Sequence, residues 1–174
     1  TGALQAREME AQVLDAMAPD RVLTLGDNAY SSGTDAQFAG CYHPTWGRHK
    51  DKTHPSPGNH DYNTGAATGY FNYFGAAAGD PTKGYYAFDL GAWRFYALNS
   101  NCGAVSCAAG SEQEQWLRTD LEQNPRTCTA AFMHHPRFAS GHTSGRRNNP
   151  SMAALFQAFY DLSGDLWLVG HNHQ

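Results

Sequence analysis

Side chains that bind metal ions gather in four short clusters along the sequence. The clusters are Gly26-Asp27, Gly58-Asn59-His60-Asp61, His134-His135-Pro136 and Gly170-His171-Asn172-His173. Asp, Asn and His side chains are potential metal ligands. Each cluster alone would more often be an ordinary turn or a satisfied polar pair, because glycine and Asx residues are common turn formers. Four such clusters together indicate one metal-binding crevice.

The segments before these clusters explain how they would meet. Short apolar runs at 21–25, 128–133 and 166–169 are typical of buried strands, and a short extended segment is expected at 53–57. In open α/β sheets the binding crevice lies beyond the carboxyl ends of the strands. The pattern therefore predicts that four strand ends deliver Asp, Asn and His side chains to one place.

The remaining segments alternate between helical and extended patterns. Helices are predicted over 4–17, from the capping boxes at 34–37 and 111–114, and after Asn149-Pro150. The runs 84–90 and 93–98 flank Gly91-Ala92 and predict a hairpin. Residues 62–83 are expected to form a loop whose aromatic side chains pack as a satellite cluster. The result is an α/β fold with some antiparallel character.

Composition excludes several classes of protein. The chain has 174 residues, 41% of them hydrophobic, and a formal net charge of −4. This length fits one compact domain. Without a stripe of Lys or Arg, neither nucleic acid nor an anionic membrane is an expected partner. No apolar stretch approaches the ~18 residues that span a bilayer. Because the chain starts at Thr1 without a Met or a signal-peptide pattern, we expect it to derive from something longer.

Four cysteines are present, at positions 41, 102, 107 and 128. An even number favours disulfides and an oxidising compartment, and four unpaired thiols are the alternative. Three pairings are open, although the short loop between Cys102 and Cys107 would close easily. We therefore expect a secreted, extracellular or periplasmic protein.

The order of the motifs resembles a known superfamily. Gly-Asp-Asn-Ala-Tyr (26–30), Gly-Asn-His-Asp (58–61), His-His-Pro (134–136) and Gly-His-Asn-His (170–173) are similar to successive motifs of the calcineurin-like metallophosphoesterases. Tyr30 and the closing Gly-His-x-His look most like the purple acid phosphatase branch. The resemblance implies an αββα sandwich with mixed sheets, and a single catalytic domain over residues 1–174 that is incomplete at both ends. The family pattern begins with an earlier strand ending in a ligand Asp, and residues 1–25 give no match to it.

The resemblance also implies a role for each matching residue. Asp27 would bridge two metal ions, Fe(III) and Zn, Mn or Fe(II). The second ion would be completed by Asn59, His134 and His171, and the first would be held by Tyr30 and His173. The ions would activate a hydroxide that attacks phosphorus.

Acid catalysis would come from histidines that are not ligands. His60 is the first candidate to protonate the leaving group, with Asp61 orienting its ring. His142 is the second candidate acid. The alternative, that His142 is an ordinary loop histidine, is equally acceptable. The histidines at 43, 49 and 54 have no ligand spacing and are expected to be ordinary polar residues.

These observations predict a metal-dependent hydrolase of small-molecule phosphate monoesters. The alternatives are a phosphodiesterase or nucleotide pyrophosphatase on the same metal core, and a non-catalytic secreted binding protein with this fold. The missing first motif leads us to expect poor stability and little activity from the chain as written. The oligomeric state and the natural substrate stay open.

Overall fold

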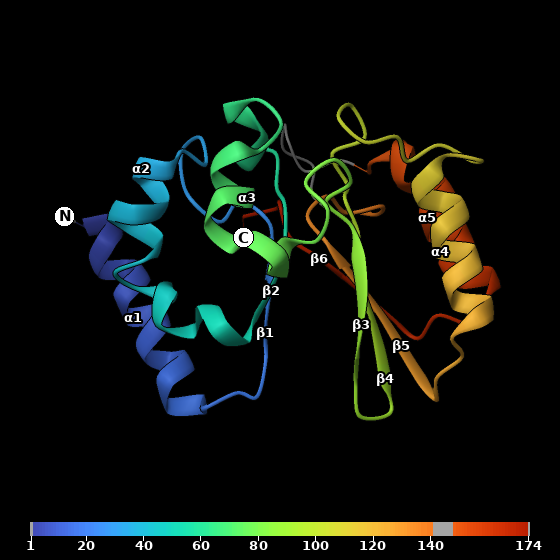
Figure 1. The fold of residues 1–174 in the computed structure, drawn as a ribbon, viewed down its shortest axis with the longest axis horizontal. Coiled ribbons are helices and arrows are strands. Elements are labelled where there is room, and N and C mark those ends of the chain that lie inside the picture. The colour runs from blue at the N-terminus through green and yellow to red at the C-terminus, as the bar shows by residue number, and fades with distance from the viewer. Residues whose placement is uncertain (1, 141–147, 174) are drawn as a thin grey trace.

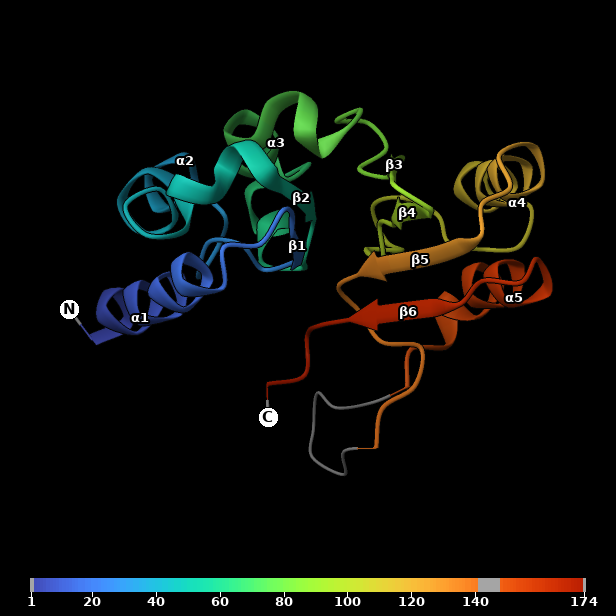
Figure 2. The same cartoon turned by 90° about the horizontal axis from the view of Figure 1, so that it is seen from below.

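Two β-sheets packed between two groups of helices make up the protein. The computed structural model describes residues 2–140 and 148–173 (Figure 1). The expected αββα arrangement is confirmed, because helices lie outside both sheets (Figure 2). No helix in these described ranges has the length and apolar character needed to cross a bilayer.

The first sheet is small and parallel. It consists of β1 (Val22–Leu25) and β2 (Thr53–Ser56), which confirms the strands predicted at 21–25 and 53–57. The helices on its outer side are α1 (Gly2–Met17), α2 (Asp35–Gln37) and α3 (Thr68–Phe74). The capping box at the start of α2 is present, with both of its hydrogen bonds.

The second sheet is larger and mixed, with strand order β3-β4-β5-β6. Its antiparallel pair is the predicted hairpin, and the other two pairs are parallel. The strands are β3 (Tyr86–Leu90), β4 (Trp93–Ala97), β5 (Cys128–Met133) and β6 (Leu166–Val169). Figure 2 shows α4 (Glu112–Gln123) and α5 (Ala153–Asp161) on the side of this sheet away from β1.

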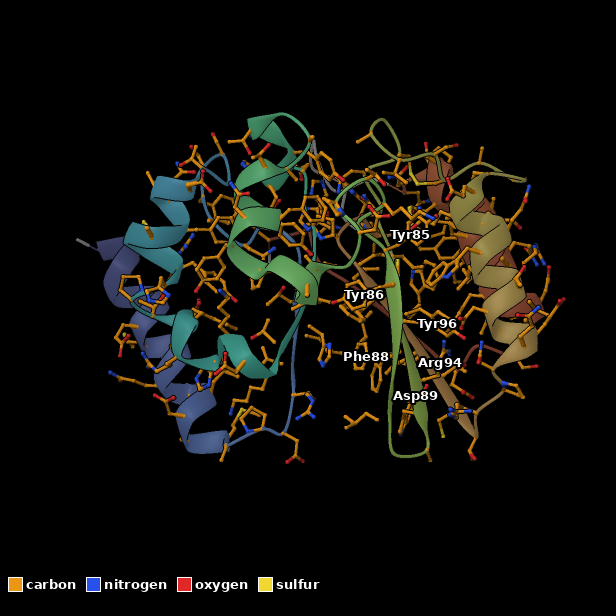
Figure 3. The ribbon with its side chains drawn as sticks, in the orientation of Figure 1. Tyr85, Tyr86, Phe88, Asp89, Arg94 and Tyr96 are labelled. Carbon is orange, nitrogen blue, oxygen red and sulfur yellow. A yellow bond between two sulfur atoms is a disulfide. The ribbon has the colours of Figure 1, made fainter. Side chains whose placement is uncertain are left out.

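Alternation along the hairpin packs the sheets together. Tyr86 and Phe88 point toward the first sheet, whereas Tyr85 and Tyr96 point toward α4 (Figure 3). The Tyr86 hydroxyl donates to the Pro55 carbonyl of β2 at 2.8 Å. The ring of Phe88 stacks on that of His54 with centroids 3.6 Å apart. One face of β3 therefore joins the two sheets, and the other belongs to the core beneath α4.

That core is the main hydrophobic cluster of the protein. It joins the second sheet to α4 and α5 and includes the buried side chains of Tyr96, Leu117, Met133, Leu155 and Phe159. The second predicted capping box is only half formed: the Ser111 hydroxyl accepts from the backbone of Glu114, but the Glu114 carboxylate accepts from the Gly110 nitrogen. The helix still starts where the pattern predicts, because one orphan backbone donor is satisfied.

The prediction of a loop at 62–83 is wrong in part. This segment contains α3, with 3-10 turns before and after it at Asp61–Thr64 and Gly75–Ala78. Glycines flank the seven-residue helix and conceal its periodicity. The expected aromatic cluster is confirmed: Tyr70 and Phe74, four residues apart, pack with Phe38 and Tyr42. Tertiary burial of these rings favours a helix that local propensity does not predict.

The apolar stripe of α1 does not form a core face. Met9, Val13 and Met17 are 67%, 58% and 68% exposed. The helix is attached by the fully buried Ala11 and by ion pairs, in which Arg48 contacts Glu8 at 3.0 Å and Asp15 at 2.9 Å.

One of the possible disulfides is formed, between Cys102 and Cys107. Cys41 and Cys128 are unpaired thiols, each partly buried. The even number of cysteines therefore predicted disulfide bonding correctly for one pair and not for the other.

Candidate metal centre

Two glycines let the clusters meet at one edge of the sandwich. A Cβ atom at Gly26 would lie 2.6 Å from Nδ1 of His134, and Gly26 also has a φ of +84°. At Gly58, a Cβ atom would lie 2.1 Å from the backbone nitrogen of Asp27. Only glycine permits such close approach of backbone and side chain. Any larger residue would push Asp27 away from His134 or from the turn that carries Asn59.

The backbone is strained at two of the candidate ligands. Asp27 has a φ of +53° and His171 a φ of +69°, both in the left-handed region. Such residues cost of order 1–3 kcal/mol and concentrate at functional sites, where the surrounding structure holds them.

Three donor atoms surround Nε2 of His134. Asn59 Oδ1 lies at 2.9 Å, His171 Nδ1 at 3.0 Å and Asp27 Oδ2 at 3.2 Å. Ligand atoms lie about 2.0–2.2 Å from a zinc ion, so neighbouring ligands of one ion are about 3.0–3.5 Å apart. His134 Nε2 therefore already has, to each of the other three atoms, the spacing of ligands that share one cation.

The orientation of the His134 ring suits a ligand. Its Nδ1 lies 2.7 Å from the carbonyl oxygen of Leu25. A carbonyl can only accept, so Nδ1 carries a proton, and Nε2 faces the centre, where it can offer a lone pair to a cation or hold a second proton. Metal-binding imidazoles are commonly fixed in this way by a backbone carbonyl. Lone pairs of Asn59 and Asp27 face the same point. They would repel the lone pair of His134 Nε2 unless a cation or a proton lies among them.

Asp27 is ionised at neutral pH. Burial of its carboxyl group would raise the pKa, but the hydrogen bond and charge of His134 and the hydrogen bond from the His60 backbone, at 2.9 Å, lower the pKa to about 2. Asp27 thus offers a carboxylate whose Oδ1 is held by the backbone. Its Oδ2 faces both His134 and Tyr30.

Tyr30 and His173 extend the cluster beyond Asp27. The Tyr30 hydroxyl donates to Asp27 Oδ2 at 3.1 Å, and its oxygen lies 3.0 Å from Nε2 of His173. Burial, with the charge of Asp27 and the hydrogen bond to it, raises the pKa of Tyr30 to about 12. Without a metal ion the side chain is therefore a neutral phenol.

His60 lies at the edge of the centre. Its Nδ1 donates to the carbonyl oxygen of Ser31 at 2.6 Å, and its Nε2 lies 4.0 Å from Asp27 Oδ2. The ring packs beside that of Tyr30, with centroids 4.8 Å apart. One nitrogen is thus anchored and the other faces the cluster.

Asp61 differs from its expected role. The expectation was that its carboxylate orients the His60 ring, but the Ser31 carbonyl makes that contact. Asp61 is fully buried, and its Oδ2 accepts from the Gly58 nitrogen at 2.9 Å and from the Asn28 backbone and side chain. Burial raises its pKa despite these bonds. The Asp61 carboxyl group holds the turn that carries Asn59 against the turn that carries Asp27. Its role is therefore to position these two backbone segments rather than the His60 ring.

The sequence interpretation missed His135. Ligand atoms of His134, His135 and His171 lie within 4.8 Å of one another, and the His135 ring is partly buried. Burial, followed by the charges of His134 and His171, lowers its pKa to about 4. Its position directly after His134 was the available signal. His142, the second candidate acid, lies outside the described residues.

The donor set fits two neighbouring metal ions. Asn59, His134 and His171 form one set of donors, Tyr30 and His173 form a second, and Asp27 Oδ2 contacts both His134 and Tyr30. A carboxylate between two sets of ligands suits a bridging role, and the mixture of oxygen and nitrogen donors suits iron, zinc or manganese. Figure 2 shows why these residues meet, because β5 and β6 both run toward the half of the molecule that carries β1.

Comparison with known proteins bears on the fold and the family. No curated protein matches the chain. The fold is similar to a purple acid phosphatase, PPD1, from yellow lupin (Lupinus luteus) seeds, with a TM-score of 0.65 and 17% sequence identity. That match covers 96% of this chain and 33% of the lupin chain, so the chain spans about a third of that protein's length. The sequence profile of the calcineurin-like phosphoesterases matches residues 5–174, and the chain belongs to that family.

Proposed function

We propose that this chain forms a two-metal centre that hydrolyses phosphate monoesters. Asp27, Tyr30 and His173 would hold the first ion, and Asn59, His134 and His171 would hold the second together with Asp27. The observation that carries the proposal is the meeting of three donor atoms from three chain segments within 3.2 Å of His134 Nε2. A structural or purely binding protein gains nothing from such a cluster of lone pairs.

Tyr30 favours a ferric ion at the first position. The pKa of its hydroxyl is raised to about 12, so only a strongly charged ion would displace the phenolic proton near neutral pH. The second position offers imidazole, amide and carboxylate donors, which suit zinc, manganese or ferrous iron.

The residues around the ions would divide the remaining work. When bound, two metal ions would acidify a water molecule and balance the charge of the phosphate oxygens. His60, with Nδ1 anchored on Ser31, would hold a proton on Nε2 and give it to the departing alkoxide. Asp61 would keep the Asn59 and Asp27 turns in register through the Gly58 and Asn28 hydrogen bonds.

A secreted protein acting on small-molecule esters is the most consistent setting. The Cys102–Cys107 disulfide supports an oxidising compartment, since cytosolic thiols are kept reduced.

The test is metal-dependent hydrolysis of 4-nitrophenyl phosphate by the purified full-length protein that contains this chain. We expect activity after loading with Fe(III) and Zn²⁺, and loss of activity on chelation. Asn59→Ala should lose the second ion and the activity. Asn72→Ala, which removes an exposed amide that bonds Asp35, should change neither. Activity that survives complete removal of metal would contradict the proposal.

The ferric assignment has its own spectroscopic test. The iron-loaded protein should show a visible phenolate-to-iron charge-transfer band that Tyr30→Phe abolishes. Tyr160→Phe, at a side chain 69% exposed, is the matched control and should keep the band. A band that persists in Tyr30→Phe would assign Tyr30 to packing alone.

A further inference from the structure

A pocket of about 620 Å³ opens directly beside the candidate metal centre. Asn59, a candidate ligand, and His135, the neighbour of His134, both line it. Its far walls come from the loop that follows β4 and from Asn149 and Ser151, which precede α5. Its size is in the range of small-molecule sites.

A buried hydrogen-bond network builds one wall of this pocket. Asn99 is 0% exposed, and its Nδ2 donates to the Tyr62 hydroxyl at 2.7 Å and to the Lys83 carbonyl at 2.9 Å. The Asn99 backbone nitrogen donates to Gln113 Oε1 at 2.8 Å, and Gln113 Nε2 donates to the Asn99 carbonyl at 3.0 Å. The Cys102–Cys107 disulfide closes the same loop. A satisfied buried network of this kind rigidifies its surroundings, so the pocket is largely pre-formed.

The same loop is bonded to the metal centre at two points. Asn101 Nδ2 donates to the carbonyl of Pro57, two residues before Asn59, at 3.1 Å. The Ser100 hydroxyl accepts from the His135 backbone at 2.8 Å and lies 3.0 Å from the His135 ring. The pocket is therefore fixed relative to the point where an ester bond would be broken.

The chemistry of the lining indicates what the pocket binds. Amide and hydroxyl side chains line it, with the His135 imidazole and small apolar residues between them. The amides and hydroxyls are those of Asn59, Tyr62, Ser100, Asn101, Asn149 and Ser151. No Asp, Glu, Lys or Arg is among the described residues that line it. Amides and hydroxyls pair well with hydroxyl groups, whereas a buried charge without a counter-charge is costly.

We propose that this pocket binds the leaving group of the ester, and that it selects phosphate monoesters of uncharged, hydroxylated alcohols over esters whose leaving group is anionic. The inference rests on the proposed function, since a leaving-group site needs a phosphoesterase centre beside it. It goes further by naming the substrate class and the residues that select it.

A matched pair of substrates tests the selection. Glycerol 3-phosphate and 3-phosphoglycerate differ by a hydroxymethyl group in place of a carboxylate. With the metal-loaded protein, kcat/KM should favour glycerol 3-phosphate by about 10-fold, a size typical of one unmatched group in a binding site. A ratio near one, or in favour of 3-phosphoglycerate, would overturn the inference.

A single charge in the pocket should change this ratio. A Cβ atom at Gly103, in the exposed part of the lining loop, meets nothing within 4 Å, so Gly103→Lys adds a cation without a clash. We expect it to shift the ratio toward 3-phosphoglycerate by about 3- to 10-fold, the effect of one charge at ~5 Å in a solvated site. Gly40→Lys is the matched control, because Gly40 is equally open and does not line the pocket. Equal shifts in both variants would assign the effect to net charge and overturn the inference.

Binding without turnover separates the two proposals. Backbone amide shifts should be followed by NMR while a non-hydrolysable phosphonate analogue of glycerol 3-phosphate is added. Changes at Gly103, Ala104 and Ser151, with no hydrolysis of any ester, would retain the pocket and reject the proposed function. Hydrolysis of 4-nitrophenyl phosphate with shifts confined to Arg7 and Leu23, in the pocket between α1 and β1, would retain the function and reject this site.

Discussion

The two halves of the molecule are packed very differently, although both contribute to the metal centre. The second sheet and its helices enclose a continuous core, and β4 is tied to α4 by two hydrogen bonds of 2.6 and 2.8 Å from Arg94 to Asp120. The first sheet has two strands, and α1 beside it turns Met9, Val13 and Met17 outward. A pocket of about 460 Å³ lies between α1 and β1.

This difference shows what holds the candidate ligands of the first half. Asp27 and Asn59 leave a small sheet, and their contacts run to His134 of the second half. His134 in turn bonds the Leu25 carbonyl at the end of β1. The candidate metal centre is thus a joint between a half with a continuous core and a half whose α1 turns apolar side chains outward. The effect of a mutation should depend on which half it lies in.

The largest effect should come from breaking the joint. His134→Ala removes the atom at which the donors meet, and a lost ligand weakens metal binding by more than the 10–100-fold typical of supporting residues. We expect loss of one bound ion and of hydrolysis, measured by metal analysis and 4-nitrophenyl phosphate turnover. His43→Ala, which removes an exposed ring bonded to Tyr73, is the control and should behave as wild type. Full metal content in His134→Ala would contradict the ligand assignment.

His60 sharpens the comparison, because it belongs to the first half but is not proposed as a ligand. His60→Ala should lower kcat by roughly 10²–10⁴, the usual contribution of a general acid, while metal content stays normal. A coincident loss of metal would make His60 a ligand or a structural residue instead.

Stability should separate the halves directly. Leu117 is fully buried between α4 and the second sheet, so Leu117→Ala should lower the free energy of unfolding by about 2–5 kcal/mol. Val13→Ala on α1 should change it by less than about 0.5 kcal/mol, because Val13 is 58% exposed. Urea unfolding measures both. A large loss in Val13→Ala would mean that another surface covers α1 in solution.

The smallest effect concerns the contact between the sheets. Burial against Phe88, and then the charge of Arg21, lower the pKa of His54. A histidine with a lowered folded-state pKa contributes stability that is complete above its unfolded pKa of about 6.5 and is lost as the pH falls below it. Between pH 7.5 and 5.5 the wild type should therefore lose more unfolding free energy than His54→Phe. Identical losses would show that His54 does not titrate with unfolding.

The sequence alone determined where the candidate ligands lie along the chain and which family they indicate. Short apolar runs that end at Gly26, His134 and Gly170 predicted β1, β5 and β6, and the candidate ligands after them proved to converge. Such features are local: a strand, a cap or a hairpin is specified by residues a few positions apart. The family match covers residues 5–174, which include these strand-end motifs.

Only the tertiary structure decided how these pieces act on one another. The bond between His134 and Leu25 joins residues 109 positions apart, and no local pattern predicts it. The same is true of the hydrogen bonds from Asn28 to Asp61, and of the outward face of α1, whose apolar spacing is that of a buried helix. Periodicity tells which side chains share a face, but burial of that face depends on what packs against it, and that is a property of the whole fold.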